Sequence, residues 1–187
     1  QSQVVGHVIR TDIKDAYIAR RISLNAGLPV HTQSLTLNRL CGSGLEAITF
    51  ASQQIQLGEV GVAVAGGAES MSSAAHLLTT NRWGQKMGDG VIQDELTGAL
   101  TDPFGVGHMG VTAENLAEKY SITREQQDEF ALLSQQRAVA AIAEGRFVDQ
   151  IVPITLKSRK GDTEFATDEH PRAAANLDSL LALKPVF

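Results

Sequence analysis

The sequence predicts an α/β protein with a parallel, layered core. Residues 34–37 alternate polar and apolar side chains, as a half-buried strand does, and apolar residues then recur at helical spacing from Leu45 to Ile55. Residues 60–65 follow as a continuously apolar run, which is typical of a strand covered on both faces. This order of strand, helix and strand is the pattern of a β-α-β unit, whose two strands lie parallel.

The elements before this unit fit the same core. Residues 4–9 have the apolar character of a strand, and Asp15 is expected to cap a helix that ends at Gly27, with Pro29 beyond it. His7 falls in the first strand, and we interpret it as an ordinary polar residue of the surface or the strand end. The helix after residue 42 has a stop signal at Leu57-Gly58.

The second half of the chain is less regular. Residues 72–110 hold many glycines and weak periodicity, which indicates a functional loop or lid. Helices are predicted over 112–120 and, from a capping box at Thr123 and Gln126, up to Gly145. Residues 151–156 form a strand with a bulge or edge at Pro153, and a hairpin leads to 163–165. Beyond Asp168 we expect an irregular chain without a closing element.

Cys41 lies on the predicted turn between a strand and a helix, and it is the one cysteine of the chain. Unpaired backbone N–H groups and the positive end of the helix dipole meet at such a position, and both favour the nucleophilic thiolate. Gly42 and Gly44 allow backbone or substrate to approach closely. The alternative is that Cys41 is a small buried apolar residue, the commonest place of a free cysteine.

Composition narrows the class of protein. The chain has 187 residues, of which 43% are hydrophobic and 20% charged, as in an ordinary globular domain. The net charge of −5 argues against a nucleic-acid binder, and one cysteine excludes an intrachain disulfide. We find no apolar run that could span a membrane and no leader sequence, and therefore expect a reducing, cytoplasmic location.

Ordered motifs occur along almost the whole chain: residues 38–45 (Asn-Arg-Leu-Cys-Gly-Ser-Gly-Leu), 64–72, 86–89, 107–115, 145–147, 151–153 and 160–162. These blocks resemble those of the thiolase family, which includes acetyl-CoA acetyltransferases and β-ketothiolases. The resemblance implies an α/β fold with a partial thiolase-like layered β-α-β core over residues 1–70. It also implies an inserted α+β loop domain over 71–187 that binds coenzyme A.

The resemblance further implies CoA-dependent thiolysis of 3-ketoacyl-CoA, or the reverse Claisen condensation of acetyl-CoA. Cys41 matches the nucleophile that carries the acyl group, and its backbone N–H matches a donor of the oxyanion hole. His108, Met109 and Leu100 match positions beside the thioester and the pantetheine. The remaining matches lie toward the nucleotide end of CoA: Arg172 and Ser179, and more weakly Gln135 and Phe187.

Two family motifs are not found in this sequence. The family activates its nucleophile with the histidine of a Gly-His-Pro motif and moves protons with a second cysteine. In this chain His170-Pro171 follows Glu169 instead of glycine, and no second cysteine occurs. We therefore expect an interior part of a thiolase subunit, lacking the first strand and the C-terminal half, that does not turn over alone.

Other readings of the residues stay open. A catalytically incomplete module could bind CoA or mediate oligomerisation, and a cysteine hydrolase could pair Cys41 with His108 or His76. The basic turn at 157–162 is either a solvated turn or a site for a phosphorylated ligand. The resemblance implies CoA and acyl-CoA as substrates, no resident cofactor or metal, a role in fatty acid metabolism, and a homodimer or homotetramer formed partly through residues 77–90.

Overall fold

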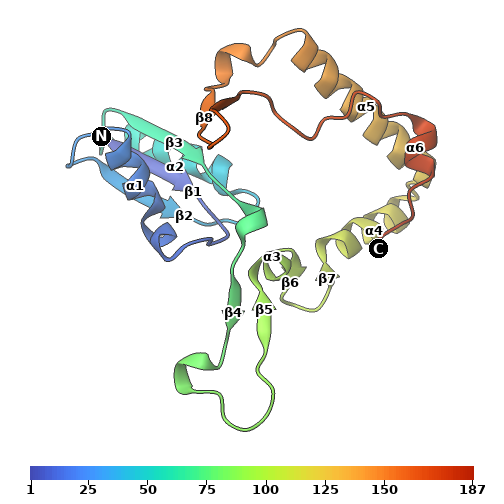
Figure 1. Ribbon diagram of the computed structural model, residues 1–187, viewed down its shortest axis with the longest axis horizontal. Coiled ribbons are helices and arrows are strands. Elements are labelled where there is room, and N and C mark those ends of the chain that lie inside the picture. The colour runs from blue at the N-terminus through green and yellow to red at the C-terminus, as the bar shows by residue number, and fades with distance from the viewer. The chain divides into compact units, whose positions relative to one another are not determined.

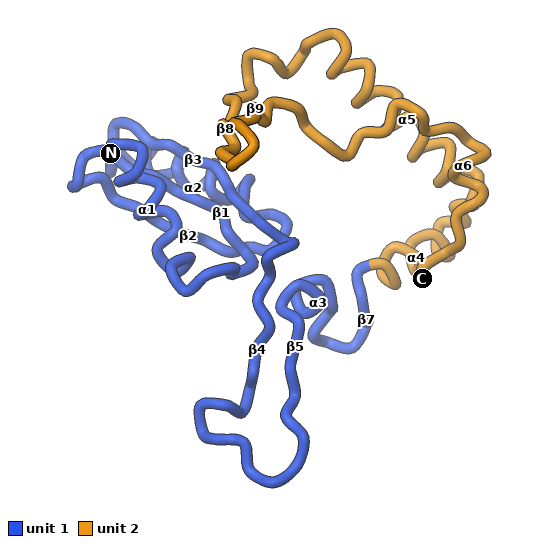
Figure 2. The backbone as a smooth tube through the Cα atoms, viewed as in Figure 1, with its two compact units in different colours: residues 1–109 blue, residues 110–187 orange.

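The computed structural model describes residues 1–187, which form two compact units, 1–109 and 110–187 (Figure 2). The sequence instead places the change from core to loop domain after residue 70. The functional assignment of 71–187 as a CoA-binding domain stays a prediction. Each unit is described by itself below.

The core of the first unit is a parallel three-stranded sheet in the order β2-β1-β3, made of β1 (Ser2–Gly6), β2 (Gln33–Leu37) and β3 (Ala63–Gly67). Helix α1 (Ile18–Asn25) connects β1 to β2, and α2 (Ser43–Gln56) connects β2 to β3 (Figure 1). The two crossovers run in opposite directions across the sheet. Because such crossovers are right-handed, the helices cover opposite faces. The predicted parallel β-α-β core is confirmed.

Small side chains let α2 lie directly on the sheet. Val4 of β1 is fully buried against Ala47 and Ala51 of α2, and Leu37, Phe50, Ala63 and Ala65 surround this cluster. Every residue of β1 is buried, because it is the central strand and has a neighbour on each side. The prediction that β3 is covered on both faces is wrong: β3 is an edge strand that pairs only with β1, and Val64 is 53% exposed.

The first strand is shorter than predicted. It ends at Gly6, and His7 still donates its backbone N–H to the carbonyl of Leu37 at 3.0 Å. The next two amides, of Val8 and Ile9, donate to the carboxylate of Glu69, both at 2.9 Å. A side chain thus replaces the neighbouring strand as the acceptor, which stops the strand ladder.

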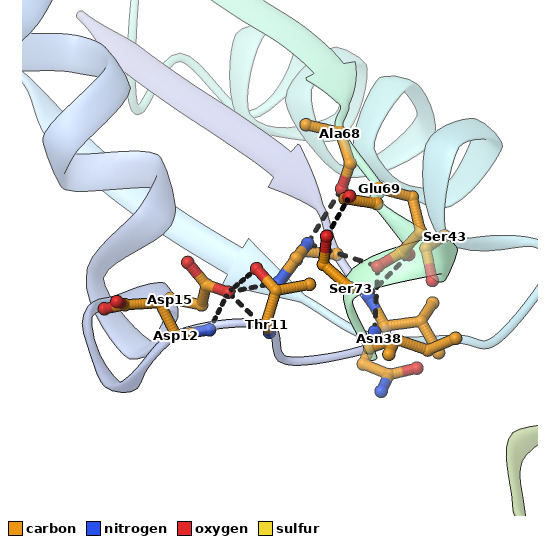
Figure 3. A network of polar contacts seen from close by, with 12 residues as sticks. Thr11, Asp12, Asp15, Asn38, Ser43, Ala68, Glu69 and Ser73 are labelled. Atoms are coloured by element: carbon orange, nitrogen blue, oxygen red, sulfur yellow. Dashed lines mark hydrogen bonds and ion pairs between the residues drawn. The ribbon is translucent and has the colours of Figure 1, made fainter. Parts of the chain in front are cut away.

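The first helix begins earlier than predicted, and Asp15 is not its N-cap. Asp12 caps a short 3-10 helix over Ile13–Tyr17, which continues into α1, and Asp15 is the third residue of that helix in a capping box. One carboxylate oxygen of Asp15 accepts from the N–H and the hydroxyl of Thr11, both at 2.8 Å, and from the N–H of Asp12 at 2.9 Å (Figure 3).

The glycine-rich part of the first unit has more regular structure than the sequence predicted. Strands β4 (His76–Leu78) and β5 (Ile92–Asp94) pair antiparallel (Figure 1), as do the two-residue strands β6 (Thr101–Asp102) and β7 (Gly107–His108). Helix α3 (Glu95–Ala99) lies between them in the chain, and the Asp94 side chain caps it by accepting from the N–H of Leu96 at 2.9 Å. Local caps and short ladders like these carry little hydrophobic periodicity.

The second unit contains α4 (Met109–Tyr120, whose first residue belongs to the first unit), α5 (Arg124–Ala143) and a hairpin of β8 (Ile154–Leu156) and β9 (Thr163–Phe165). The capping box at Thr123 and Gln126 is confirmed, and so is the hairpin. The prediction of an irregular end is wrong. Helix α6 (Leu177–Leu181) is capped by Asn176, which forms a capping box with Ser179. None of the helices is both long and apolar enough to cross a lipid bilayer.

Candidate functional site at Cys41

Cys41 lies where the sequence placed it, one residue before Gly42, the N-cap of α2. Its side chain is exposed rather than buried among apolar residues, so the structural reading of this cysteine as a small core residue is wrong. Gly42 has no side chain to cap the helix. The N–H groups of the first turn of α2 point toward the start of the helix, and Gly42 offers them no side-chain acceptor.

The turn that carries Cys41 is held by its neighbours. The Asn38 side chain accepts from the N–H of Leu40 at 2.8 Å. The buried hydroxyl of Ser43 donates to the carbonyl of Leu40 at 2.7 Å and accepts from the N–H of Arg39 at 2.8 Å. The Arg39 guanidinium also pairs with the carboxylate of Glu46, one turn into α2. These bonds fix the backbone on both sides of Cys41.

Leu40 has a φ of +50°, in the left-handed region that bulky residues seldom adopt. Such a conformation persists only where the surrounding structure over-determines it, and it is concentrated at functional sites. No pattern in the sequence indicates this strain. The side chain of Leu40 also lines the cavity beside Cys41.

A cavity of about 380 Å³ lies against Cys41. Its walls come from the carboxyl ends of β1 and β3, from the turn before α2 and from α3. They are mostly apolar and include Gly6, Leu40, Gly67, Met71, Leu96 and Leu100. The chain passes from β1 to β2 on one side of the sheet and then to β3 on the other side of β1. The direction of the connections therefore reverses beside β1. Ligands of open α/β sheets bind outside the carboxyl ends of the strands at such a switch point.

The predicted site residues of the first unit fall into two groups. Cys41 and Leu100 line the same cavity. His108 and Met109 are tied to Leu100 and its neighbour: His108 pairs with Thr101 between β7 and β6, and the N–H of Met109 donates to the carbonyl of Leu100 at 2.8 Å. His76, proposed as a hydrolase partner, is the first residue of β4 and pairs with Asp94, so nothing in its contacts links it to Cys41.

The other four predicted residues lie in the second unit. Gln135 on α5 accepts a hydrogen bond from the N–H of Arg172 at 2.8 Å, so these two residues are in contact. The hydroxyl and the N–H of Ser179 form hydrogen bonds of 2.7–3.3 Å with Asn176, which caps α6. The ring of Phe187 lies on Gly110 at the start of α4, where a Cβ on that glycine would be 2.2 Å from it.

Sequence reasoning missed the burial of His7 and several residues of the cavity wall. His7 follows the wall residue Gly6 in the chain and is buried: its Nδ1 lies 2.7 Å from the carbonyl oxygen of Ala68 and 3.4 Å from a carboxylate oxygen of Glu69. Met71, Leu96 and Ala99 line the cavity although they follow the predicted core. No spacing rule signals such positions, because the contacts join segments that are far apart in the chain.

An exposed cysteine at a helix start, beside an apolar cavity at a switch point of parallel strands, defines a site suited to covalent acyl transfer. Comparison with known proteins gives the family. Residues 1–187 match the thiolase N-terminal domain, and the chain therefore belongs to the thiolase family.

Similar proteins of known name agree with this assignment. The chain is 54% identical over 184 residues to beta-ketothiolase BktB of Cupriavidus necator. The matched region covers 98% of this chain and 47% of that protein. It is 49% identical over 171 residues to an acetyl-CoA acetyltransferase of Pseudomonas aeruginosa, covering 90% and 44%. The chain thus spans about half the length of the relatives it matches.

Solved structures show the same relationship. The acetyl-CoA acetyltransferase of Bacillus anthracis superposes with a TM-score of 0.93 at 47% identity, over 100% of this chain and 47% of that one. Human mitochondrial 3-ketoacyl-CoA thiolase superposes with a TM-score of 0.95 at 42% identity, over 100% and 47%. The same human protein in complex with CoA gives 0.93 at 41% identity, over 100% and 46%. The predicted thiolase-like fold is confirmed.

Proposed function

We propose that this chain supplies the acyl-accepting half of a thiolase, which cleaves 3-ketoacyl-CoA with CoA or, in reverse, condenses two acetyl-CoA molecules. The observation that carries the proposal is the exposed Cys41 at the start of α2, on the wall of an apolar cavity at the ends of β1 and β3. The names of the relatives, beta-ketothiolase and acetyl-CoA acetyltransferase, support the same reaction class.

The chemistry assigned to Cys41 is covalent catalysis in two steps. The thiolate attacks the 3-keto carbon, and the bond between C2 and C3 then breaks with its electron pair on C2. Protonation of C2 gives acetyl-CoA, and the remaining acyl group stays on Cys41 as a thioester. In the second step the thiolate of CoA attacks that acyl carbon, and Cys41 leaves as a thiolate.

Charge develops on the keto oxygen during both attacks, and the start of α2 is suited to receive it. Backbone N–H groups at a helix N-terminus donate to an anion, and the dipole of the helix adds to the stabilisation. Helix α2 has 14 residues and Gly42 brings no competing side chain to its start. We assign the backbone N–H of Cys41 to this oxyanion site, in line with the family resemblance.

Two groups of residues are proposed to contact CoA. Leu100, His108 and Met109 are assigned to the thioester and pantetheine; Arg172, Ser179, Gln135 and Phe187 are assigned to the nucleotide end. The pairing of Arg172 with Gln135 supports the second group, and the human thiolase crystallised with CoA supports CoA as the ligand class. We propose CoA as a substrate, with no resident cofactor or metal.

The wider setting follows from the same resemblance. We propose a role in fatty acid metabolism, a cytoplasmic location, and a homodimer or homotetramer for the protein that contains this chain. Steady turnover is not expected of these 187 residues. They hold one cysteine and no Gly-His-Pro histidine to act as the general base.

A single-turnover experiment tests the proposal. The chain is incubated with acetoacetyl-CoA, and intact-protein mass spectrometry with peptide mapping measures acetyl transfer to protein. We expect slow acetylation at Cys41, none in Cys41→Ser, and no multiple turnover. Acetylation that is equal in Cys41→Ser, or absent from a Cys41 that still reacts with a maleimide, would overturn the proposal.

One alternative has a specific observation in its favour. The single cysteine and the missing histidine also suit a catalytically incomplete module that binds CoA or pairs with another chain. Calorimetry with CoA on wild type and Arg172→Ala separates the two. Binding that depends on Arg172 without any acetylation of Cys41 would favour the module.

A further inference from the structure

His7 follows the last residue of β1 and is buried although its side chain is ionisable: 8% of the residue is exposed. Its Nδ1 lies 2.7 Å from the carbonyl oxygen of Ala68 and 3.4 Å from a carboxylate oxygen of Glu69. A carbonyl oxygen can only accept, so Nδ1 carries a proton and donates a hydrogen bond to Ala68. One nitrogen of the ring therefore has a fixed role.

The other nitrogen, Nε2, is buried and has no hydrogen-bond partner. Oδ2 of Asp15 faces it at 3.7 Å. Donation from the N–H and the hydroxyl of Thr11, and then from the N–H of Asp12, lowers the pKa of Asp15 to about 2, so this group is a carboxylate at neutral pH. In a neutral ring Nε2 is an acceptor that faces another acceptor, which is unfavourable when both are buried. A proton taken up from solvent turns Nε2 into a charged donor facing Asp15.

The charged groups around the ring are the carboxylates of Asp15 and Glu69, which come from separate segments of the chain (Figure 3). Strands β2 and β3, on either side of β1, contain no ionisable side chain. The nearest elements otherwise bring Arg39, before α2, and Arg20, on α1, and both guanidinium groups bond elsewhere. We call His7, Asp15 and Glu69 the His7 cluster.

Part of the cavity wall at Cys41 depends on the His7 cluster, because Ala68 and Glu69 both line that cavity. The carbonyl of Ala68 accepts from His7, and its N–H donates to the carbonyl of Gly6 at 3.1 Å. The carboxylate of Glu69 accepts from the two backbone N–H groups directly after His7, both at 2.9 Å. This part of the wall is thus held by residues 6–9. Within that stretch, His7 has the one side chain that can change its charge.

We propose that His7 is a positioning residue of the Cys41 site: its ring holds the wall at Ala68 and Glu69, and it sets the charge of that wall by binding or releasing a proton at Nε2. With the proton bound, the positive ring lies 3.4 and 3.7 Å from the two carboxylates and offsets the charge of Glu69. With the proton released, the carboxylate of Glu69 acts on the cavity without this offset. Histidine is the side-chain type that responds in this way between about pH 5 and 8.

The consequence is a discrimination between anionic and neutral groups at Cys41 that changes with pH. An anionic acyl group should be disfavoured more strongly when the ring is neutral. This inference rests on the proposed role of Cys41 as acyl acceptor, and His7 itself touches no reacting atom.

The test uses the one cysteine of the chain and needs no turnover. Rates of Cys41 alkylation are measured with anionic iodoacetate and neutral iodoacetamide at about pH 5.5 and 8.5, each divided by the rate of the same reagent with 2-mercaptoethanol. The ratio of the two normalised rates reports the charge near the sulfur, because both reagents use the same thiolate. In wild type the ratio of iodoacetate to iodoacetamide should be about two- to fivefold higher at the lower pH.

Variants identify the group responsible. His7→Gln and His7→Asn replace the ring by a neutral amide, and in whichever of them folds the ratio should no longer change with pH. Glu69→Gln should raise the ratio at the higher pH, because the wall loses its carboxylate. The matched control is His31→Gln, the same change at an exposed histidine, which should keep the pH dependence of wild type. Circular dichroism selects the variants that fold.

Two NMR measurements test the positioning itself. Long-range ¹⁵N–¹H spectra of the neutral His7 ring should show a proton on Nδ1 and none on Nε2. Hydrogen exchange of the amides of residues 8 and 9, which donate to Glu69, should be faster in a folded His7 variant than in His31→Gln. A merely electrostatic effect of the ring would leave this exchange unchanged.

Four outcomes overturn the inference: a neutral ring protonated at Nε2, a wild-type ratio that does not change with pH, a change that survives in a folded His7 variant, or equal amide exchange in the His7 variant and His31→Gln. Alkylation involves neither CoA nor acyl transfer. Failed acetylation of Cys41 with an intact pH dependence of the ratio would therefore refute only the proposed function, and acetylation with a constant ratio would refute only the role of His7.

Discussion

Gly6, the last residue of β1, lies against Ser43, the first residue of α2, so closely that a Cβ on Gly6 would be 2.7 Å from the carbonyl carbon of Ser43. The end of the central strand thus supports the helix start that carries Cys41. Gly67 of β3 approaches the same place, since a Cβ on it would be 3.3 Å from the carbonyl oxygen of Gly6. Two glycines at strand ends therefore set the position of the helix start beside Cys41.

The first prediction concerns Gly6. Gly6→Ala should destabilise the chain by about 1–3 kcal/mol, because backbone atoms of Ser43 must move. Urea unfolding measures the effect. Gly44→Ala is the control of opposite sign: nothing lies within 4 Å of a Cβ there and the residue is helical, so a gain of up to about 1 kcal/mol is expected. Equal effects at both positions would contradict the packing described for Gly6.

The second prediction concerns the hydroxyl of Ser43. Ser43→Ala leaves the N–H of Arg39 and the carbonyl of Leu40 without this partner, which should cost about 1–3 kcal/mol. Hydrogen exchange at residues 39–41 should become faster, since the turn is no longer held. Ser52→Ala, an exposed position on the same helix, serves as control. Unchanged exchange in Ser43→Ala would show that the turn does not depend on this hydroxyl.

The third prediction is the pH dependence set by Asp15. Donation from the N–H and the hydroxyl of Thr11, and then from the N–H of Asp12, lowers the pKa of Asp15 to about 2. The unfolded chain has the ordinary value of about 3.9. The folded state thus favours the carboxylate. Its contribution to stability is complete above about pH 5 and is lost progressively as the pH falls toward 2.

Asp15→Asn isolates this contribution. The difference in urea midpoint between wild type and variant should be constant from neutral pH down to about 5 and shrink between about 4 and 2. A difference that stays the same across this acid range would mean that the charge of Asp15 does not act through these bonds.

The fourth prediction concerns Arg124 in the second unit. Its guanidinium pairs with Asp128 at 2.8 Å and donates to the carbonyls of Leu180 and Leu183, at 2.7 and 3.0 Å, which joins α5 to the end of α6. In Arg124→Lys the single ammonium group cannot reproduce the planar set of donors of the guanidinium. About 1–3 kcal/mol of local stability should therefore be lost. Hydrogen exchange should rise in residues 177–183. Arg137→Lys, exposed on the same helix, should leave that exchange unchanged.

Much of the fold could be predicted from local patterns. Periodicity and turn residues in short stretches of the sequence act locally, and they predict several features of the fold. These are the β-α-β order, the turn at Cys41, the capping box at Thr123 and the 151–165 hairpin. Even α6 has a local signal that was missed, since Asn176 and Ser179 form a capping box. The family could also be identified, because its motifs occur in order along the chain.

The cap of the first helix shows where local reasoning is ambiguous. Asp12 and Asp15 are both good capping residues, and only the hydrogen bonds of Thr11 and Asp12 to Asp15 decide between them. His7 shows a different limit. Its burial depends on Ala68 and Glu69, about sixty residues further along the chain, which no pattern around His7 can report.

The sequence alone determined the family and the position of Cys41 at a helix start, because each depends on neighbouring residues. Only the tertiary structure decided what surrounds the sulfur: the close approach of Gly6 to Ser43, the strained backbone of Leu40, and the cavity that Cys41 lines together with Leu100. The physical reason is that a cavity is formed by side chains from separate segments. Its shape depends on how β1, β3 and α3 pack together.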